Sequence, residues 1–267
     1  MAIWNGEDGT PMPLANAALM AFVKRMPVLI ATSTYNHQGK SANGGGAPDW
    51  FFANALASPP EYRHNFSTLL CEAGTEWDHR NCALSWMRAH WKPERIWILD
   101  LDEFYFDTDL DRAIQTVEND RVNACWGVPR VAYWKGLNWR VDPPEPGTCL
   151  LAFDPNRAAA FVWIRTVALN SSGSMGVMEG LLQHHATAVR SDEEMRRKWA
   201  SFSHGFELHP KWFADKWEGW TPETTDLHPT YPELWKRAVP VGEGDLPEPL
   251  RPLYRYYRYE PVAAQKG

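Results

Sequence analysis

One short segment, Trp97–Phe104, constrains the fold more than any other part of the chain. It reads Trp-Ile-Leu-Asp-Leu-Asp-Glu-Phe, so an apolar run ends in three acids that one leucine interrupts. Apolar runs of this kind are typical of buried β-strands, whose successive side chains point to opposite faces. We therefore expect Asp100 and Asp102 to point the same way and Leu101 to point into the core. Two carboxylates at the carboxyl end of a buried strand suit a hard divalent cation, which suggests chemistry on a phosphorylated substrate.

The overall composition is that of an ordinary globular protein. Of its 267 residues, 44% are hydrophobic and 22% are charged, so the chain can bury a full core. The formal net charge of −6 argues against general coating of nucleic acid, although it leaves room for a local basic patch. No apolar run is long enough to cross a bilayer, and residues 1–10 do not resemble a secretory signal. The cysteines lack zinc-site spacing, so we expect reduced thiols and a cytoplasmic protein.

Tryptophan is unusually abundant, with 15 residues against 9 tyrosines and 11 phenylalanines. Indole rings pack well in cores, and their flat faces also suit sugar rings and cations. We interpret most of these tryptophans as core residues. Their number nevertheless leaves open an alternative function, that of a non-catalytic carbohydrate-binding protein.

Helices and strands are expected to alternate in the first part of the chain, with strands dominating afterwards. The expected helices are 13–25, 78–90 and a segment capped by Thr108 or Asp109, and the expected strands are 28–32, 66–71 and the acid-bearing strand. Proline-rich turns predict short strands in 122–153, and the capping box Ser191–Glu194 opens a later helix. We predict one α/β domain over 1–267, with a mixed, mostly parallel sheet flanked by helices and a small antiparallel extension. Residues 220–267, rich in proline and aromatic residues, are predicted to wrap around this body.

Two adjacent histidines, His184 and His185, are candidate metal ligands. Imidazole binds Mn²⁺-like ions well, so a histidine could complete a site with the acids if the fold brings them together. A buried, hydrogen-bonded pair of histidines is the structural alternative.

Three cationic side chains are candidate phosphate ligands. Arg80 lies at the front of a predicted helix, and Arg190 and Lys198 flank the helix that the capping box opens. A guanidinium fork matches phosphate or carboxylate oxygens, and an ordinary structural salt bridge is the alternative for each of them. Residues 251–259 interleave arginine with tyrosine, a pattern that also suits nucleic acid, although packing of the tyrosines on the body is the preferred interpretation.

Four segments of the chain resemble sequence motifs of family-2-type glycosyltransferases, and they occur in the same order as in that family. The motifs are an opening strand with a Thr-Tyr-Asn turn, an Arg-Asn-x-x-Leu helix, an Asp-x-Asp metal motif and a downstream His-His…Lys sequence block found in bacterial and phage members. The four segments are Val28–Asn36, Arg80–Leu84, Leu99–Glu103 and His184–Lys198. The resemblance implies a GT-A (Rossmann-like) fold and an enzyme that transfers a sugar from a nucleotide-sugar donor, with a UDP-sugar expected, to an acceptor hydroxyl.

The same resemblance implies roles for individual residues. Asp100 and Asp102 would contact a Mn²⁺ or Mg²⁺ ion and the donor ribose, and His184 or His185 would complete the coordination. The residues expected along the donor nucleotide and its diphosphate are Thr34, Tyr35, Asn36, Arg80 and Lys198. Glu179 is the nearest candidate for the carboxylate that accepts the acceptor proton.

The acceptor and the exact class of reaction stay open at this stage. A glycan hydroxyl, a protein hydroxyl and a hydroxymethylated pyrimidine in phage DNA all fit the resemblance, which implies a bacterial or phage-infected cell. The segment 251–259 fits DNA, whereas the net charge of −6 does not favour it. A nucleotidyltransferase would share the metal acids, but the glycine run 44–46 lacks the lysine of a triphosphate-binding loop.

Overall fold

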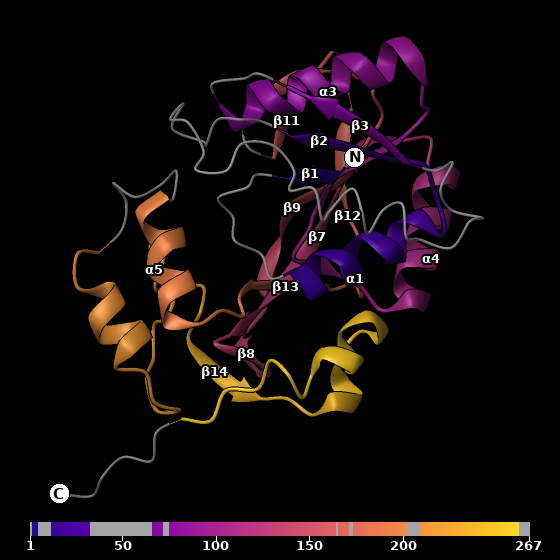
Figure 1. Ribbon diagram of the computed structural model, residues 1–267. Helices are drawn as coiled ribbons and strands as arrows, with labels where there is room; N and C mark the ends of the chain where they lie inside the picture. The colour runs from indigo at the N-terminus through magenta and orange to yellow at the C-terminus, as the bar shows by residue number, and fades with distance from the viewer. Residues whose placement is uncertain are drawn as a thin grey trace, which may run out of the picture.

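The computed structural model describes residues 2–4, 12–32, 66–71, 75–163, 165–170, 173–201 and 209–261. Two sheets organise this part of the chain (Figure 1). The smaller sheet is parallel, with strand order β3-β2-β1-β5. Its strands are β1 (Ala2–Trp4), β2 (Val28–Thr32), β3 (Phe66–Leu70) and β5 (Leu99–Asp100). The strands predicted at 28–32 and 66–71 are therefore present.

Helices α1 (Met12–Val23) and α3 (Glu76–His90) cover the two faces of the parallel sheet (Figure 1). The side chains of β2 alternate between the two faces of the sheet, and this explains the arrangement. Val28 and Ile30 belong to the buried cluster that contains α1, whereas Leu29 and Ala31 belong to the cluster that contains α3. Both predicted helices form, although α1 ends two residues before the predicted Arg25.

The larger sheet has eight strands and is mainly antiparallel: five of its seven strand pairings are antiparallel and two are parallel. Its strands are β4 (Ile96–Trp97), β6 (Glu103–Phe104), β7 (Asn123–Trp134), β8 (Gly136–Asp142), β9 (Glu145–Phe153), β12 (Ser174–Val177), β13 (Gln183–Ala188) and β14 (Arg237–Pro240). The long strand β7 is its axis, because it pairs with β8, β9, β12 and β13 along its length.

This architecture shows that the predicted fold class was wrong. We expected a GT-A-like, mostly parallel sheet flanked by helices with a small antiparallel extension, whereas the antiparallel sheet is the main part of the molecule. The prediction extended the helix–strand alternation of the first part of the chain too far. The first two connections after β7 are very short: Lys135 alone separates β7 from β8, and residues 143–144 separate β8 from β9. Connections of this length join antiparallel neighbours and leave no room for a crossover helix.

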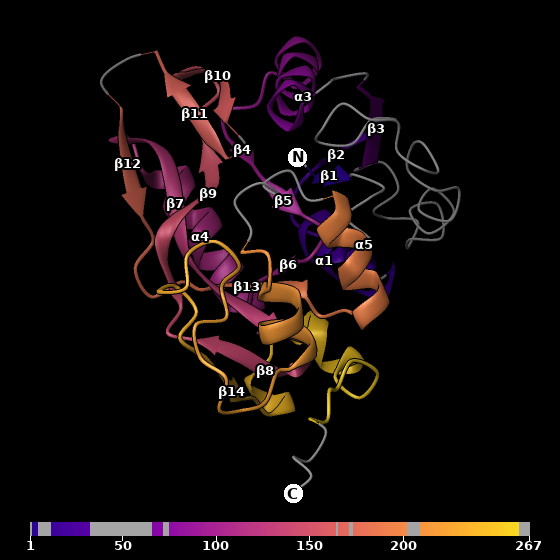
Figure 2. The same cartoon turned by 90° about the vertical axis from the view of Figure 1, so that its left-hand side faces the viewer.

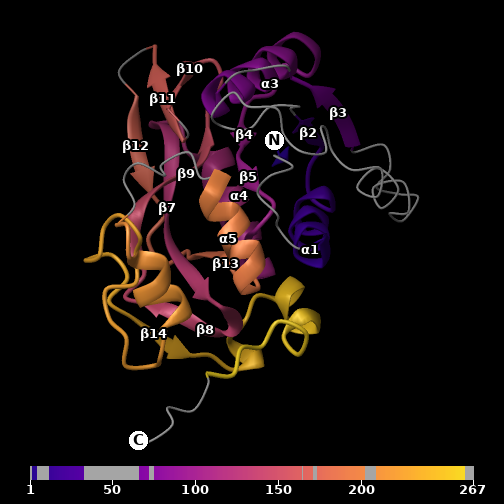
Figure 3. The same cartoon turned by 60° about the vertical axis from the view of Figure 1, so that its left-hand side comes forward.

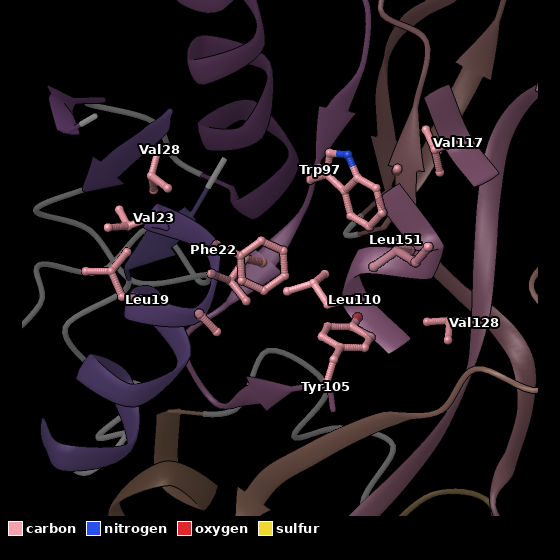
Figure 4. Close-up of a cluster of buried hydrophobic side chains, with 14 of the residues drawn as sticks. Leu19, Phe22, Val23, Val28, Trp97, Tyr105, Leu110, Val117, Val128 and Leu151 are labelled. Atoms are coloured by element: carbon pink, nitrogen blue, oxygen red, sulfur yellow. The ribbon is translucent and has the colours of Figure 1, made fainter. Parts of the chain in front are cut away.

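The two sheets share one buried core. Figure 4 shows Phe22 of α1 near Trp97, Tyr105 and Leu110, the last of which lies on helix α4 (Asp107–Asn119). Helix α4 follows Phe106, which makes no side-chain capping bond, so the predicted caps Thr108 and Asp109 were wrong. The carboxylate of a distant residue, Glu248, accepts the backbone N–H of Asp107 instead, at 3.0 Å.

Two further elements position the site described below. The hairpin of β10 (Ala158–Trp163) and β11 (Thr166–Leu169) packs beside α3 (Figure 2). Helix α5 (Asp192–Ser201) lies in front of β13 in Figure 3. The predicted capping box opens α5: the Ser191 hydroxyl accepts the N–H of Glu194 at 3.3 Å, and the Glu194 carboxylate accepts the N–H of Ser191 at 2.8 Å.

The C-terminal segment packs against the body of the molecule. It contains a π-helix (Phe213–Glu218), the strand β14 and two 3-10 helices (Glu243–Asp245 and Glu248–Leu253). Tyr254 and Tyr257 pack against a buried cluster, in agreement with the preferred interpretation of the segment 251–259. None of the described helices is both long and apolar enough to span a membrane.

Candidate functional site

Three acids gather where the parallel sheet meets the larger sheet. Asp100 ends β5, Asp102 lies in the following turn, and Glu103 begins β6. We call these residues the acid cluster. Leu101 is buried in the core, as predicted. The negative charge of Asp102 acts on Asp100 and tends to raise its pKa. The two predicted carboxylates are therefore neighbours in space.

Arg80 reaches the acid cluster from the first turns of α3. Its Nη2 lies 3.2 Å from Oδ1 of Asp100, and the residue is only 1% exposed. Helix α3 is held in place by its N-cap, Thr75, whose hydroxyl accepts the N–H of Asp78 at 3.2 Å. The structure therefore places Arg80 beside the acids, where its partner is a carboxylate, and its expected contact with a nucleotide or diphosphate stays a prediction.

Of the two adjacent histidines, only His185 lies at the acid cluster. Strand β13 pairs with β6, so that His185 is opposite Glu103. The Nε2 atom of His185 lies 3.3 Å from Oδ1 of Asp102. Successive residues of a strand point to opposite faces, and His184 accordingly contacts the Tyr133 hydroxyl through Nδ1 at 2.8 Å. Burial lowers the pKa of His184 to about 3, so its ring is a neutral, buried group away from the acids.

A second arginine, Arg165, bridges the acids and was missed by the sequence analysis. Its Nη2 lies 2.9 Å from Oδ2 of Asp100 and 2.6 Å from Oε1 of Glu103. Arg165 lies in the turn between β10 and β11, more than 60 residues along the chain from the acids, and no local sequence signal marks it. Glu103 is 1% exposed and also accepts the backbone N–H of Asp100 through Oε2 at 3.1 Å. Glu103 therefore holds both the turn and Arg165.

Lys198 and Arg190 complete the charged surroundings of Asp102. Nη2 of Arg190 lies 4.0 Å from Oδ2 of Asp102. Lys198, on α5, donates to the Thr187 hydroxyl at 2.7 Å, and its charge helps to lower the pKa of Asp102. Four cationic side chains (Arg80, Arg165, Arg190 and Lys198) thus surround three carboxyl groups.

The pKa values of the acid cluster follow from this charge balance. Burial alone would raise the pKa of Asp100, but Arg165 and Arg80 outweigh it and lower the pKa to about 2. Burial would likewise raise the pKa of Asp102, but His185, Lys198 and Arg190 together outweigh it and hold that pKa well below its usual range. Burial does raise the pKa of Glu103. Asp100 and Asp102 are therefore ionised at neutral pH, and cations exceed anions in the region, which favours a polyanionic ligand.

Glu179 and the predicted Thr-Tyr-Asn turn are the remaining predicted site residues. Glu179 is exposed and borders a separate cavity together with Arg112 and Asp120, so the structure does not bring it to the acid cluster. Thr34, Tyr35 and Asn36 lie outside the described residues, and their contact with a nucleotide stays a prediction.

A cavity of about 580 Å³ opens directly beside the acid cluster. Arg165, His185 and Lys198 belong both to the surroundings of the acids and to the lining of this cavity. Among the described residues, five tryptophans also line it, namely Trp134, Trp163, Trp199, Trp212 and Trp235. We call it the tryptophan cavity. A volume of this order is typical of small-molecule sites.

Asp102 and His185 are the pair best placed to hold a metal ion. Ligand bonds of about 2.0–2.2 Å place two neighbouring ligands of one ion about 3 Å apart, close to the 3.3 Å between Oδ1 of Asp102 and Nε2 of His185. Within the described part of the chain, no group of three or more His, Cys, Asp or Glu residues is arranged to hold a metal. A site here would therefore need further ligands from a substrate or from water. No protein-family model matches the chain, and no curated protein matches it.

Proposed function

We propose that this protein is a metal-dependent glycosyltransferase, which moves a sugar from a nucleotide-sugar donor to an acceptor hydroxyl. The supporting observation is that Asp102, His185 and four cations converge beside a small-molecule-sized cavity, which Arg165, His185 and Lys198 line. Each part of that arrangement has a task in transfer from a diphosphate. The expected donor class is a UDP-sugar, on the resemblance of the motifs described above.

Two protein ligands suit a Mn²⁺ or Mg²⁺ ion that is shared with a substrate. Such ions commonly take one or two carboxylates and obtain their other ligands from phosphates and water. Histidine at the second position favours Mn²⁺, since imidazole is a good ligand for that ion and a poor one for Mg²⁺. An ion bound at Asp102 and His185 would supply charge neutralisation for the departing diphosphate.

The cations of the chain would bind and orient that diphosphate. The guanidinium fork of Arg165 matches phosphate oxygens, and Lys198 adds a point charge, because both residues border the cavity. Arg80 and Arg190 are almost fully buried and would add positive charge behind them. Asp100 holds Arg80 and Arg165 in position before the donor arrives, at 3.2 and 2.9 Å. Fixed charges of this kind stabilise the negative charge that develops as the sugar–phosphate bond breaks, without any rearrangement at that moment. Glu179 has no part in this mechanism, because it borders a different cavity.

Stabilisation by ligands tests this proposal directly. A ligand present at about 100 times its dissociation constant stabilises the folded state by about 2.7 kcal/mol, which raises the melting temperature of a chain of this size by on the order of 5–10 °C. We expect such a rise with a UDP-sugar and Mn²⁺ together, accompanied by slow hydrolysis of the donor. Asp102→Asn keeps the shape of the side chain and removes its charge. It should weaken the affinity for the donor with Mn²⁺ at least tenfold and slow donor hydrolysis at least tenfold.

Glu118→Gln is the matched control, since it makes the same carboxyl-to-amide change at an exposed position of α4. It should behave as the wild type. Full donor turnover by Asp102→Asn would contradict the metal assignment. Consumption of a nucleoside triphosphate in place of a nucleotide sugar would instead indicate a nucleotidyltransferase.

The tryptophan cavity favours one alternative function, a carbohydrate-binding protein without catalysis. That alternative predicts saccharide binding that is indifferent to nucleotide and metal. Calorimetry with UDP, in the presence and absence of Mn²⁺, separates the two functions, because only the glycosyltransferase binds UDP in a metal-dependent way.

A further inference from the structure

The tryptophan cavity combines an open aromatic face with fixed polar groups. Trp163 stacks on Trp77, with ring centroids 5.0 Å apart and planes 20° from parallel. Trp163 is nevertheless 47% exposed and lines the cavity. Trp77 therefore covers one face of this indole, while about half of the residue stays exposed. An exposed indole face next to polar groups is well suited to a ring that is apolar on its faces and polar at its edges.

A carboxylate with spare hydrogen-bonding capacity lies in the cavity wall. Glu145 accepts from Nη2 of Arg130 at 2.6 Å and from Nε1 of Trp235 at 2.6 Å, through different carboxylate oxygens. Burial tends to raise the pKa of Glu145, but Arg130 outweighs it and leaves the pKa below the usual value. The carboxylate is therefore ionised at neutral pH. Oε2 also accepts from Nε of Arg130 at 3.1 Å, whereas Oε1 accepts from Trp235 alone. Each carboxylate oxygen has two acceptor sites, so Oε1 of Glu145 can also accept a hydroxyl group from a ligand.

A histidine and an indole in the same wall offer donors. Nδ1 of His228 accepts the backbone N–H groups of Thr230 and Tyr231, at 3.2 and 2.9 Å. Burial lowers the pKa of His228 to about 4, so at neutral pH the ring is uncharged and carries its proton on Nε2. Nε1 of Trp134, which also lines the cavity, is buried with no hydrogen-bond partner. Unmatched buried donors are costly, and a ligand oxygen would satisfy this one.

These features together favour a neutral polyhydroxylated ligand. Hydroxyl groups both donate and accept, and so they match Glu145 on one side and His228 on the other. A phosphate-rich ligand is disfavoured at this position, because Arg130 is already paired with Glu145 and the carboxylate would repel phosphate.

We propose that the tryptophan cavity binds a sugar ring of the acceptor, so that the acceptor is a saccharide and not a modified base in DNA. This inference rests on the proposed function and specifies its acceptor. Arg165, His185 and Lys198 border both the cavity and the acid cluster. A saccharide stacked in the cavity would therefore present a hydroxyl at the place where the donor diphosphate binds.

The test measures binding of saccharides and of DNA to the whole chain in the absence of donor. A panel of neutral mono- and disaccharides is titrated by calorimetry, beside duplex DNA that contains hydroxymethylcytosine. We expect at least one saccharide to bind, and Trp163→Ala to weaken that binding about tenfold, as expected for the loss of an aromatic platform. Val162→Ala is the matched control, because Val162 is the neighbouring residue of β10 and is 55% exposed. It should bind as the wild type does.

A second variant guards against a general loss of fold. Glu145→Gln keeps the shape of the side chain and the acceptor for Trp235, and it should weaken saccharide binding while the circular dichroism spectrum stays unchanged. The proposal is overturned if no saccharide binds, if Trp163→Ala binds like the wild type, or if only the DNA binds and accepts sugar. Stabilisation of the wild type by a UDP-sugar with Mn²⁺ is scored separately, so that failure of the acceptor proposal is distinguishable from failure of the proposed function.

Discussion

The acid cluster and the tryptophan cavity border the same three side chains, yet they are built in opposite ways. The acid cluster collects charged groups from β5, α3, β13, α5 and the β10–β11 turn, and it holds them through ion pairs. The tryptophan cavity is lined by indoles that pack on one another, with Trp199 stacked on Trp212 at 4.4 Å. The first region is held by charges that offset each other, and the second by apolar area removed from water. Changes in the two regions should therefore have different consequences for stability.

The largest expected effect on stability comes from the indole side of this comparison. Trp134 is fully buried and its ring contacts four other indoles, those of Trp212, Trp217, Trp220 and Trp235. We expect Trp134→Ala to lower the free energy of unfolding by about 3–5 kcal/mol, because it leaves a cavity in the core. Urea denaturation followed by circular dichroism measures this loss.

Two related variants show whether burial is the cause. Trp134→Phe fills most of the space and should cost less than Trp134→Ala. Trp163→Ala removes an indole that is 47% exposed and should cost about 1 kcal/mol or less. If Trp163→Ala proved as costly as Trp134→Ala, the distinction between a packed core and an open platform would be wrong.

The next largest effect is a loss of stability at mildly acidic pH, to which two buried histidines contribute. Burial lowers the pKa of His184, which contacts Tyr133 away from the acids, to about 3, and that of His228, in the cavity wall, to about 4. Both values lie below that of a free imidazole, so the unfolded chain binds more protons once the pH falls below about 6.5. The stabilisation is complete above pH 6.5 and is lost as the pH falls toward the folded values. At pH 5.5 each histidine should lower the free energy of unfolding by about 1.4 kcal/mol relative to its value well above pH 6.5.

The difference between two proteins isolates the cavity histidine. His228→Asn keeps an acceptor for the N–H groups of Thr230 and Tyr231 and removes the titration. The free energy of unfolding of this variant should fall less than that of the wild type between pH 7 and pH 5.5. Contributions common to both proteins, such as the raised pKa of Glu103, cancel in this difference. Equal slopes for the two proteins would show that His228 is not buried as a neutral ring.

The sequence predicted much of the acid cluster, because its signals are local. An apolar strand followed by acids placed Asp100 and Asp102, and the start of a helix placed Arg80. Arg165 could not be found in this way, since its contact with Asp100 depends on where the β10–β11 hairpin packs. His184 and His185 looked equivalent in the sequence, and only the pairing of β13 with β6 decides which of them faces Asp102.

The fold itself was predicted less well, for a reason that also concerns distance along the chain. The strands around β7 are brought together by pairings such as β13 with β7 and β4 with β9, whose partners are about 50 residues apart. Several of these strands have only two to six residues and carry weak periodicity. Local sequence patterns predict the helices and strands of the first part of the chain. The larger sheet instead depends on which strands, distant in the sequence, pair with each other.

The smallest expected effect concerns α5, the helix that belongs to both regions. Lys198 of α5 acts on Asp102, while Met195 and Trp199 of the same helix line the tryptophan cavity. Ser191→Ala removes the hydroxyl that caps α5 and should lower the free energy of unfolding by about 1 kcal/mol. Glu193→Ala, at an exposed position of the same first turn that makes no capping bond to Ser191, is the control and should cost less. Hydrogen exchange of the α5 amides checks where the loss arises.

The same variant tests whether the two regions are independent binding sites. If fraying of α5 weakened donor binding and saccharide binding by the same factor, the two regions would form one site, and they would differ only in the kinds of contact that hold them together. If only donor binding weakened, the cavity would rest on its packed indoles independently of the helix.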